Sequence, residues 1–147
     1  MINKAQLETA LKEALRSGDD LRKNTIRMVL SAIKLVEIDK GAPLDETGIA
    51  LILQKEVKSR RESIADAQRA NRLDLIATSE AEISILEGFL PKPLTSDELD
   101  ALVRQAIQET GATSLREMGQ VMKVLMPRLQ GRLGGDQVSQ AVRKLLQ

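Results

Sequence analysis

The 147-residue sequence has no cysteine, histidine, tryptophan or tyrosine, and a single phenylalanine. Without cysteine or histidine it can form no disulfide, no thiolate or imidazole metal site, and no nucleophile or general base built on those side chains. Its carboxylates show no spacing typical of a shared-proton pair or a metal site. With one aromatic residue, it also lacks the platform on which proteins stack unpaired bases. We therefore expect no catalytic residues, no metal and no cofactor.

Long apolar runs are also missing. The longest falls far short of the roughly 20 residues that a membrane-spanning helix needs. The N-terminal residues, Met1 to Gln6, lack the apolar core of a signal peptide. These absences lead us to expect a cytoplasmic protein that does not enter a membrane.

Net charge is small, at +1, but it is unevenly distributed. The segment from Thr110 to Gln147 holds six basic and two acidic residues, a net charge of +4, which leaves −3 for the rest of the chain. A basic segment of this kind is a candidate face for binding phosphate groups. The candidate residues are Lys123, Arg128, Arg132, Arg143 and Lys144.

Proline is scarce, and two of the four prolines flank Lys92, just after the only aromatic residue, Phe89. Pro91 and Pro93 each lack a backbone N–H and push the preceding residue out of helical geometry. The segment is consistent with an ordinary connection between helices, but we favour a stiff hinge in which Phe89, Pro91 and Pro93 separate two helical units. This division predicts an N-terminal unit over 1–90 and a C-terminal domain over 91–147.

Apolar residues recur at helical spacing along the whole chain, and no strand pattern competes with them. The sequence therefore predicts an all-α protein, with an N-terminal helical bundle followed by a small C-terminal three-helix domain. The helices are expected at about 3–16, 19–40, 45–70, 72–88, 95–110, 114–126 and 136–147.

The second predicted helix carries two patterns besides its core stripe. Met28 and Leu35 widen the apolar stripe, which suggests burial on more than one side. A polar and mainly basic stripe consists of Lys23, Arg27, Ser31 and Lys34. This stripe fits a solvated face or an anion-binding face.

Charged residues interrupt the apolar face of the third predicted helix. Glu56 and Arg60 lie within that face at an i, i+4 spacing with the acid first, which is the favourable order. We expect them to form an ion pair at the edge of the core, because an unpaired buried charge is costly. On the next helix, Glu80, Glu82 and Glu87 are expected to face solvent.

Capping residues and a proline predict where the C-terminal helices begin and end. Capping boxes are expected where a Thr or Ser is followed three residues later by Glu, at Thr95–Glu98 and at Ser114–Glu117. Met126-Pro127 is expected to end or kink the helix that the second box opens, and Asp136 to cap the last helix. The Met118, Met122 and Met126 ladder is expected to fill the core. The Gly131–Gly135 loop is either a plain connection or an anion site at a helix N-terminus.

An ordered series of motifs resembles the GatB/YqeY family, and specifically its stand-alone YqeY-like members. The motifs are Arg27-Met28 with Leu30 to Lys34 and Glu37-Ile38, Gln54 to Lys58 with Arg60 to Ser63, Leu86-Glu87, Leu90-Pro91-Lys92 with Leu94, Gly111-Ala112, Met118-Gly119, Val121-Met122, Met126-Pro127 and Gly131-Arg132. Asn71 departs from the pattern, since it stands where the family often has glycine.

The resemblance implies two all-helical units, the second similar to the tail domain of the B subunit of glutamyl/aspartyl-tRNA amidotransferases. That tail recognises tRNA, whereas the catalytic parts of those enzymes lie in other domains. The resemblance therefore implies a non-catalytic module that binds tRNA or another structured RNA. Carbon–nitrogen ligase activity with glutamine as donor would be attached to it only by association. A helical protein-interaction adaptor, docking a partner through the Met ladder or the hinge, is the alternative.

Overall fold

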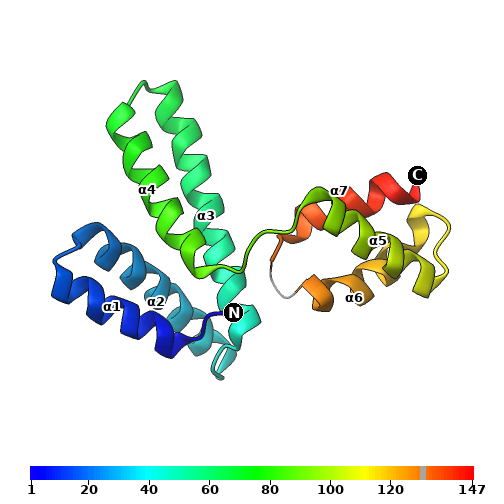
Figure 1. Cartoon of the computed structure of the whole chain (residues 1–147), viewed down its shortest axis with the longest axis horizontal. Coiled ribbons are helices and arrows are strands. Elements are labelled where there is room, and N and C mark those ends of the chain that lie inside the picture. The colour runs from blue at the N-terminus through cyan, green and yellow to red at the C-terminus, as the bar shows by residue number, and fades with distance from the viewer. Residues whose placement is uncertain (130–131) are drawn as a thin grey trace. The chain divides into compact units, whose positions relative to one another are not determined.

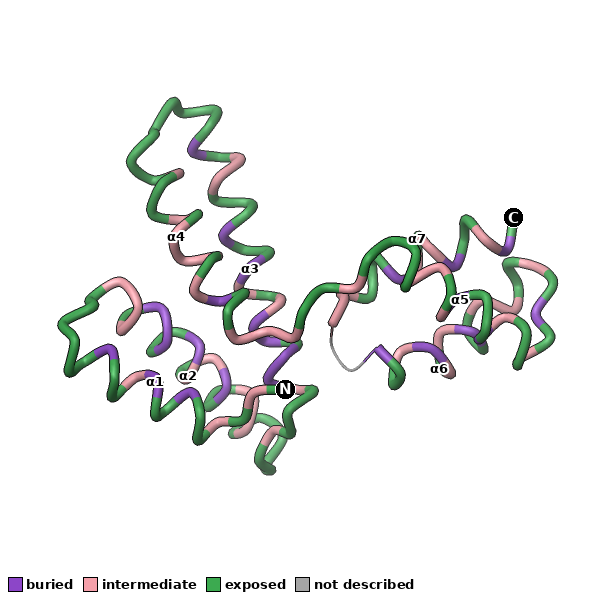
Figure 2. Tube along the Cα trace, viewed as in Figure 1, coloured by how far each residue is buried: buried purple, intermediate pink, exposed green. Residues whose placement is uncertain are grey.

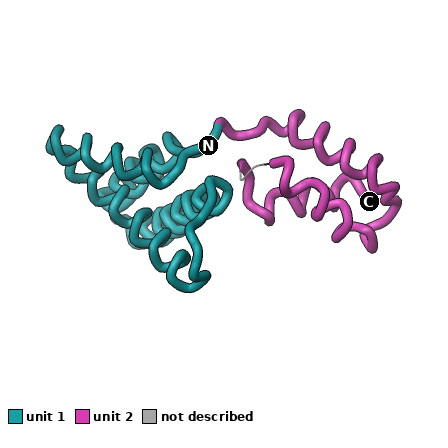
Figure 3. The backbone as a smooth tube through the Cα atoms, turned by 90° about the horizontal axis from the view of Figure 1, so that it is seen from below, with its two compact units in different colours: residues 1–91 teal, residues 92–147 magenta. Residues whose placement is uncertain are grey.

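The structure is a computed structural model that describes residues 1–129 and 132–147. The described residues form helices and no strand, which confirms the all-α fold expected from the helical periodicity. The chain separates into two compact units, Met1–Pro91 (unit 1) and Lys92–Gln147 (unit 2), which Figure 3 colours separately. Each unit has its own core.

Unit 1 consists of two helix hairpins, which Figure 1 shows diverging towards their loops. Helices α1 (Lys4–Ser17) and α2 (Asp20–Lys40) form the first, and α3 (Glu46–Arg69) and α4 (Leu73–Phe89) form the second. Tight left-handed turns allow both reversals: Gly18 has φ 72° and Asn71 has φ 53°. Asparagine tolerates this conformation better than most residues, so Asn71 can end α3 as a glycine would.

The core of unit 1 lies where the hairpins meet. Its buried residues come from all four helices: Leu7, Val29, Ile33, Ile49, Ile52, Leu53, Val57 and Leu86. Phe89 packs against this cluster from the end of α4, and the Arg22 guanidinium lies 5.1 Å from the centre of its ring. Phe89 therefore anchors the last residues of unit 1 to the start of α2.

The outer side of α2 is left uncovered, which corrects one expectation. Met28 and Leu35 were expected to be buried, but they are 54% and 65% exposed. The physical reason is that helical periodicity identifies which side chains form an apolar stripe. It does not tell how many neighbouring helices pack against that stripe. Figure 2 shows exposed residues running along both helices of the first hairpin.

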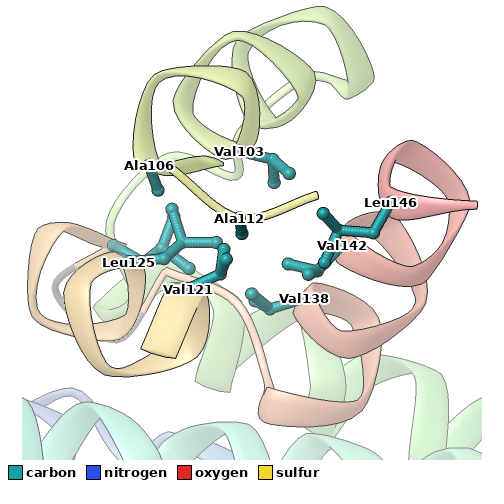
Figure 4. Close-up of a cluster of buried hydrophobic side chains, with 9 residues drawn as sticks. Val103, Ala106, Ala112, Val121, Leu125, Val138, Val142 and Leu146 are labelled. Atoms are coloured by element: carbon teal, nitrogen blue, oxygen red, sulfur yellow. The ribbon is translucent and has the colours of Figure 1, made fainter. Parts of the chain in front are cut away.

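Unit 2 packs three α-helices around one apolar cluster. They are α5 (Ser96–Thr110), α6 (Met118–Leu129) and α7 (Gly135–Leu146), with a short 3₁₀ helix, η1 (Leu115–Glu117), before α6. Figure 4 shows Val103 and Ala106 of α5 facing the α6 and α7 side chains, with Ala112 among them. The Met ladder is half-buried and packs against this core, as expected of core filler.

Three helix boundaries in unit 2 differ from the expectation. Helix α6 continues through Pro127 to Leu129; the proline lies in the last turn, and the buried Leu129 side chain offsets the lost hydrogen bond. Ser114 makes no side-chain cap, because the residues after it form a 3₁₀ turn. Asp136 does not cap α7, which begins at Gly135 after a Gly134 N-cap.

Within the described residues, no helix combines the length and the apolar character needed to cross a membrane.

Candidate functional site

The five basic candidates of unit 2 fall into two groups. Lys123 on α6, and Arg143 and Lys144 in the last turn of α7, are exposed and have no ion-pair partner among the described residues. Arg128 and Arg132 each donate a hydrogen bond to another residue of unit 2. The structure therefore does not gather the five side chains around one point.

Arg128 joins α6 to α5. Its guanidinium donates to the Glu109 carboxylate, and the two side chains are 38% and 42% exposed. This hydrogen bond, opposed by partial desolvation, lowers the pKa of Glu109 and raises that of Arg128. A phosphate at Arg128 would have to compete with a carboxylate that is already in place.

Arg132 ties the segment after α6 to the beginning of unit 2. Its Nε donates to the Lys92 carbonyl oxygen over 3.0 Å, across 40 positions of sequence. The pKa of the nearby Glu98 is lowered chiefly by a hydrogen bond from the Thr95 backbone N–H. The positive charges of Arg132 and Lys92 make smaller contributions in the same direction. Arg132 therefore serves the packing of unit 2.

The loop before α7 is a poor anion site in the part that is described. Gly131, its first residue, lies outside the described residues. Asp136 lies in the first turn of α7, where its negative charge already complements the positive end of the helix dipole. A phosphate would meet this carboxylate, so the loop is better described as a connection.

A charged network in unit 1 extends the pair identified in the sequence. Arg60 of α3, only 6% exposed, donates to the Glu56 carboxylate and, over 2.9 Å, to Oε2 of Glu82 on α4. A third guanidinium nitrogen lies 3.5 Å from the Met28 sulfur of α2. One buried cation therefore joins three helices.

The sequence pattern places Glu82 on the solvent face, which is wrong: its side chain is 21% exposed and bonded to Arg60. The signal that could have found it is the hairpin turn at Asn71. Residues 60 and 82 are each 11 positions from it, so they lie opposite each other across an antiparallel helix pair. Glu87 is also paired, with Arg61 over 2.8 Å, but that pair is exposed.

The network has no evident catalytic use. In the described ranges, no group of three or more acidic, histidine or cysteine side chains could hold a metal ion. The carboxylates of Glu56 and Glu82 are both committed to a guanidinium, which keeps them from acting as a free acid and base. We therefore interpret the network as structural.

A hollow on the surface of unit 1 lies between α1 and α2. It is lined by Lys4, Glu8, Leu30, Lys34, Glu37 and Ile38. An ion pair closes part of it, since the Lys4 ammonium lies 2.8 Å from Glu37 Oε1. That hydrogen bond, followed by one from the Leu44 backbone N–H, lowers the pKa of Glu37.

Comparison with known proteins found a matching family and several fungal relatives. The family model described as "Yqey-like protein" matches residues 4–146. The protein named "Altered inheritance of mitochondria protein 41, mitochondrial" is similar in several fungi. That of Lachancea thermotolerans is 41% identical over 71% of this chain and 58% of its own length. That of Kluyveromyces lactis gives the same three values. That of Pyrenophora tritici-repentis is 31% identical over 96% of this chain and 79% of its own length.

These relatives correct the expected cytoplasmic location, because their names describe mitochondrial proteins. The expectation rested on missing apolar segments, and that absence does not discriminate among compartments. The chain also spans less than two thirds of the length of the Lachancea and Kluyveromyces relatives. Their names mention neither RNA nor amide transfer. With a family model matched over residues 4–146 and a relative 41% identical over 71% of this chain, the chain belongs to the YqeY-like protein family.

Proposed function

We propose that the chain is a non-catalytic helical module that binds tRNA or another structured RNA through unit 2, in connection with tRNA-dependent amidation. The observation that carries the proposal is the exposure of Lys123, Arg143 and Lys144. All three lack an ion-pair partner among the described residues, in a segment whose net charge is +4. Free cations on a rigid helical surface are suited to phosphate groups.

The link to tRNA is supported by the resemblance of the C-terminal domain to the tail of the amidotransferase B subunit. The chemistry of amide transfer is not proposed for this chain, since the same resemblance implies that the catalytic parts of those enzymes lie in other domains. Structured RNA is recognised largely through its shape and its phosphates. Three exposed cations in a unit that contains no aromatic residue fit that mode better than the recognition of bases.

The test replaces the three free cations together, in Lys123→Gln/Arg143→Gln/Lys144→Gln. For each phosphate that is no longer neutralised, the slope of log affinity against log salt should become shallower by about 0.9 units, or about 0.7 for single strands. Affinity should fall for every tRNA tried, because binding to phosphates carries no sequence information. Titrations of the full chain with tRNA at several salt concentrations measure both effects.

The matched control removes three exposed cations from unit 1, in Lys12→Gln/Arg16→Gln/Lys40→Gln. It changes the net charge by the same amount, so a difference between the two variants isolates the position of the charges. Thermal melts establish that both variants fold. Equal loss of affinity in the two variants, or no tRNA binding by the unaltered chain at low salt, would overturn the proposal.

The adaptor alternative has the Met ladder as one of its two expected docking surfaces, and the half-burial of that ladder supports it only weakly. Met118, Met122 and Met126 pack against the core of unit 2 and are only partly accessible. Only the exposed part of each methionine side chain is therefore open to a partner. The specific observation that favours protein docking lies in unit 1, on α2.

A further inference from the structure

The outer face of α2 combines large exposed apolar side chains with free cations. Met28, Leu35 and Ile38 are 54%, 65% and 65% exposed. Arg27 and Lys34 are also exposed, and neither has an ion-pair partner among the described residues. At 100° per residue, these five side chains fall within about 120° of the helix circumference. They form one surface, which we call the α2 face.

Apart from its Met28 end, the α2 face points away from the unit 1 core. The buried residues of α2 point the other way, towards the cluster that holds Val29 and Ile33. At one end of the face, the Met28 sulfur lies 3.5 Å from the Arg60 guanidinium. Arg60 is in turn held by two carboxylates.

Clustered apolar exposure of this kind marks an interaction surface. Met28 and Leu35 are seven residues apart, which is two helical turns and the repeat at which a second helix packs along a first. A protein partner with apolar side chains at the same repeat would cover them. RNA would satisfy the cations but leave the three apolar side chains without apolar neighbours.

The charges on this face set the chemistry of the partner. Arg27 and Lys34 lie together on one side of the apolar row, also seven residues apart. Lys23, at the edge, is already paired with Asp20 over 3.1 Å. Three acidic residues lie near the row: Glu56 and Glu82, both paired with the Arg60 that contacts Met28, and Asp39, which is exposed close to the end of α2. The middle of the face is therefore complementary to a partner that carries negative charges beside an apolar row of its own.

We propose that the α2 face docks an acidic amphipathic helix of a partner protein. Its apolar residues would repeat every three or four positions and pack on Met28, Leu35 and Ile38. Its carboxylates would lie over Arg27 and Lys34. This inference goes beyond the RNA-binding function, since it concerns unit 1 and needs no nucleic acid.

The test selects ligands without presuming their sequence. A displayed library of helix-forming peptides, random at its surface positions, is selected on the immobilised full chain. The enriched peptides should be acidic, with apolar residues at helical spacing. Each is then measured against Met28→Ser/Leu35→Ser/Ile38→Ser and against Arg27→Glu/Lys34→Glu. We expect affinity to fall at least about tenfold on either variant, as for the loss of central interface residues.

Two controls match these changes at other exposed positions. Leu15→Ser/Leu51→Ser/Leu73→Ser removes three exposed leucines, and Lys12→Glu/Arg16→Glu reverses two exposed charges on α1. Neither should alter peptide binding. Replacing the acidic residues of a selected peptide by lysine should restore its affinity for Arg27→Glu/Lys34→Glu, which a loss of folding could not produce.

Several results would overturn the proposal. One is the absence of any enriched peptide, and another is a set of peptides that bind the serine variant as well as the unaltered chain. Self-association that the serine variant abolishes would assign the face to a second copy of this chain. Binding of tRNA that Arg27→Glu/Lys34→Glu abolishes and the serine variant preserves would assign it to nucleic acid.

Discussion

Arg60 shows how a single buried charge can be accommodated in a small helical unit. Only 6% of the residue is exposed, so its guanidinium has little access to water. It is tolerated because Glu56 and Glu82 accept its hydrogen bonds, and both carboxylates remain about one-fifth exposed. Since Glu82 belongs to α4, the same interactions that satisfy the cation also join the two helices of the second hairpin.

Removing this cation should leave two carboxylates without a partner. We expect Arg60→Met, which keeps most of the side-chain length, to lower the free energy of unfolding by about 3 kcal/mol. Adding Glu56→Gln and Glu82→Gln should recover part of that loss, because neutral amides do not repel each other. Urea unfolding of the single, double and triple variants measures the coupling. Strictly additive losses would show that the three groups act independently.

Among the helices, two similar sequence signals have different outcomes. Thr95 accepts from the Glu98 N–H over 3.1 Å, and Glu98 accepts from the Thr95 N–H over 2.9 Å, so this capping box is complete. At the second site, Glu117 bonds the N–H of Thr113 over 3.2 Å and leaves the Ser114 side chain out. The residues after Ser114 form a 3₁₀ helix, and the Glu117 carboxylate accepts from Thr113 instead of Ser114, so the box does not close.

This difference predicts different costs for two equivalent substitutions. Thr95→Ala should lower the free energy of unfolding of unit 2 by about 1 kcal/mol, since an N-terminal N–H of α5 loses its acceptor. Ser114→Ala should change it by less than about 0.5 kcal/mol, as expected for a side chain with no such role. Chemical unfolding of both variants measures whether the caps at Thr95 and Ser114 contribute equally to the stability of unit 2. Equal costs would mean that Ser114 caps the helix in solution.

Across the full chain, each unit is held by its own apolar cluster. Leu86 is fully buried in unit 1, and Leu125 is fully buried in unit 2. The stiffness expected of Pro91 and Pro93 stays a prediction, since it concerns the link between the units. What can be tested directly is whether damage to one core reaches the other.

We expect Leu86→Ala and Leu125→Ala each to reduce stability only in their own unit. Replacing a buried leucine with alanine typically costs about 2–5 kcal/mol, because transfer energy is lost and a cavity remains. Hydrogen–deuterium exchange of the full chain should therefore show faster exchange in unit 1 for the first variant and in unit 2 for the second. Loss of protection in both units at once would show that they unfold together.

The helices and most of their ends could be predicted from the amino-acid sequence alone. These features are local: the apolar period, the glycine and asparagine at left-handed turns, the prolines, and the Thr95 capping box all act within a few residues. The Glu56–Arg60 spacing also lies within one helix, so the pair could be inferred from the sequence. The prediction of a box at Ser114 failed because such a box depends on the geometry of the turn before α6.

The partners that side chains find across helices could not be predicted, because they depend on how the helices pack. Glu82 reaches Arg60 because the turn at Asn71 sets the register of the second hairpin. Arg128 and Arg132 are packing residues because α5 and the start of unit 2 offer them acceptors. Met28 and Leu35 share the period of buried residues but are more than half exposed, because no further helix of unit 1 covers the outer side of α2. Local sequence sets the period of an apolar stripe, but long-range packing decides whether anything lies against it.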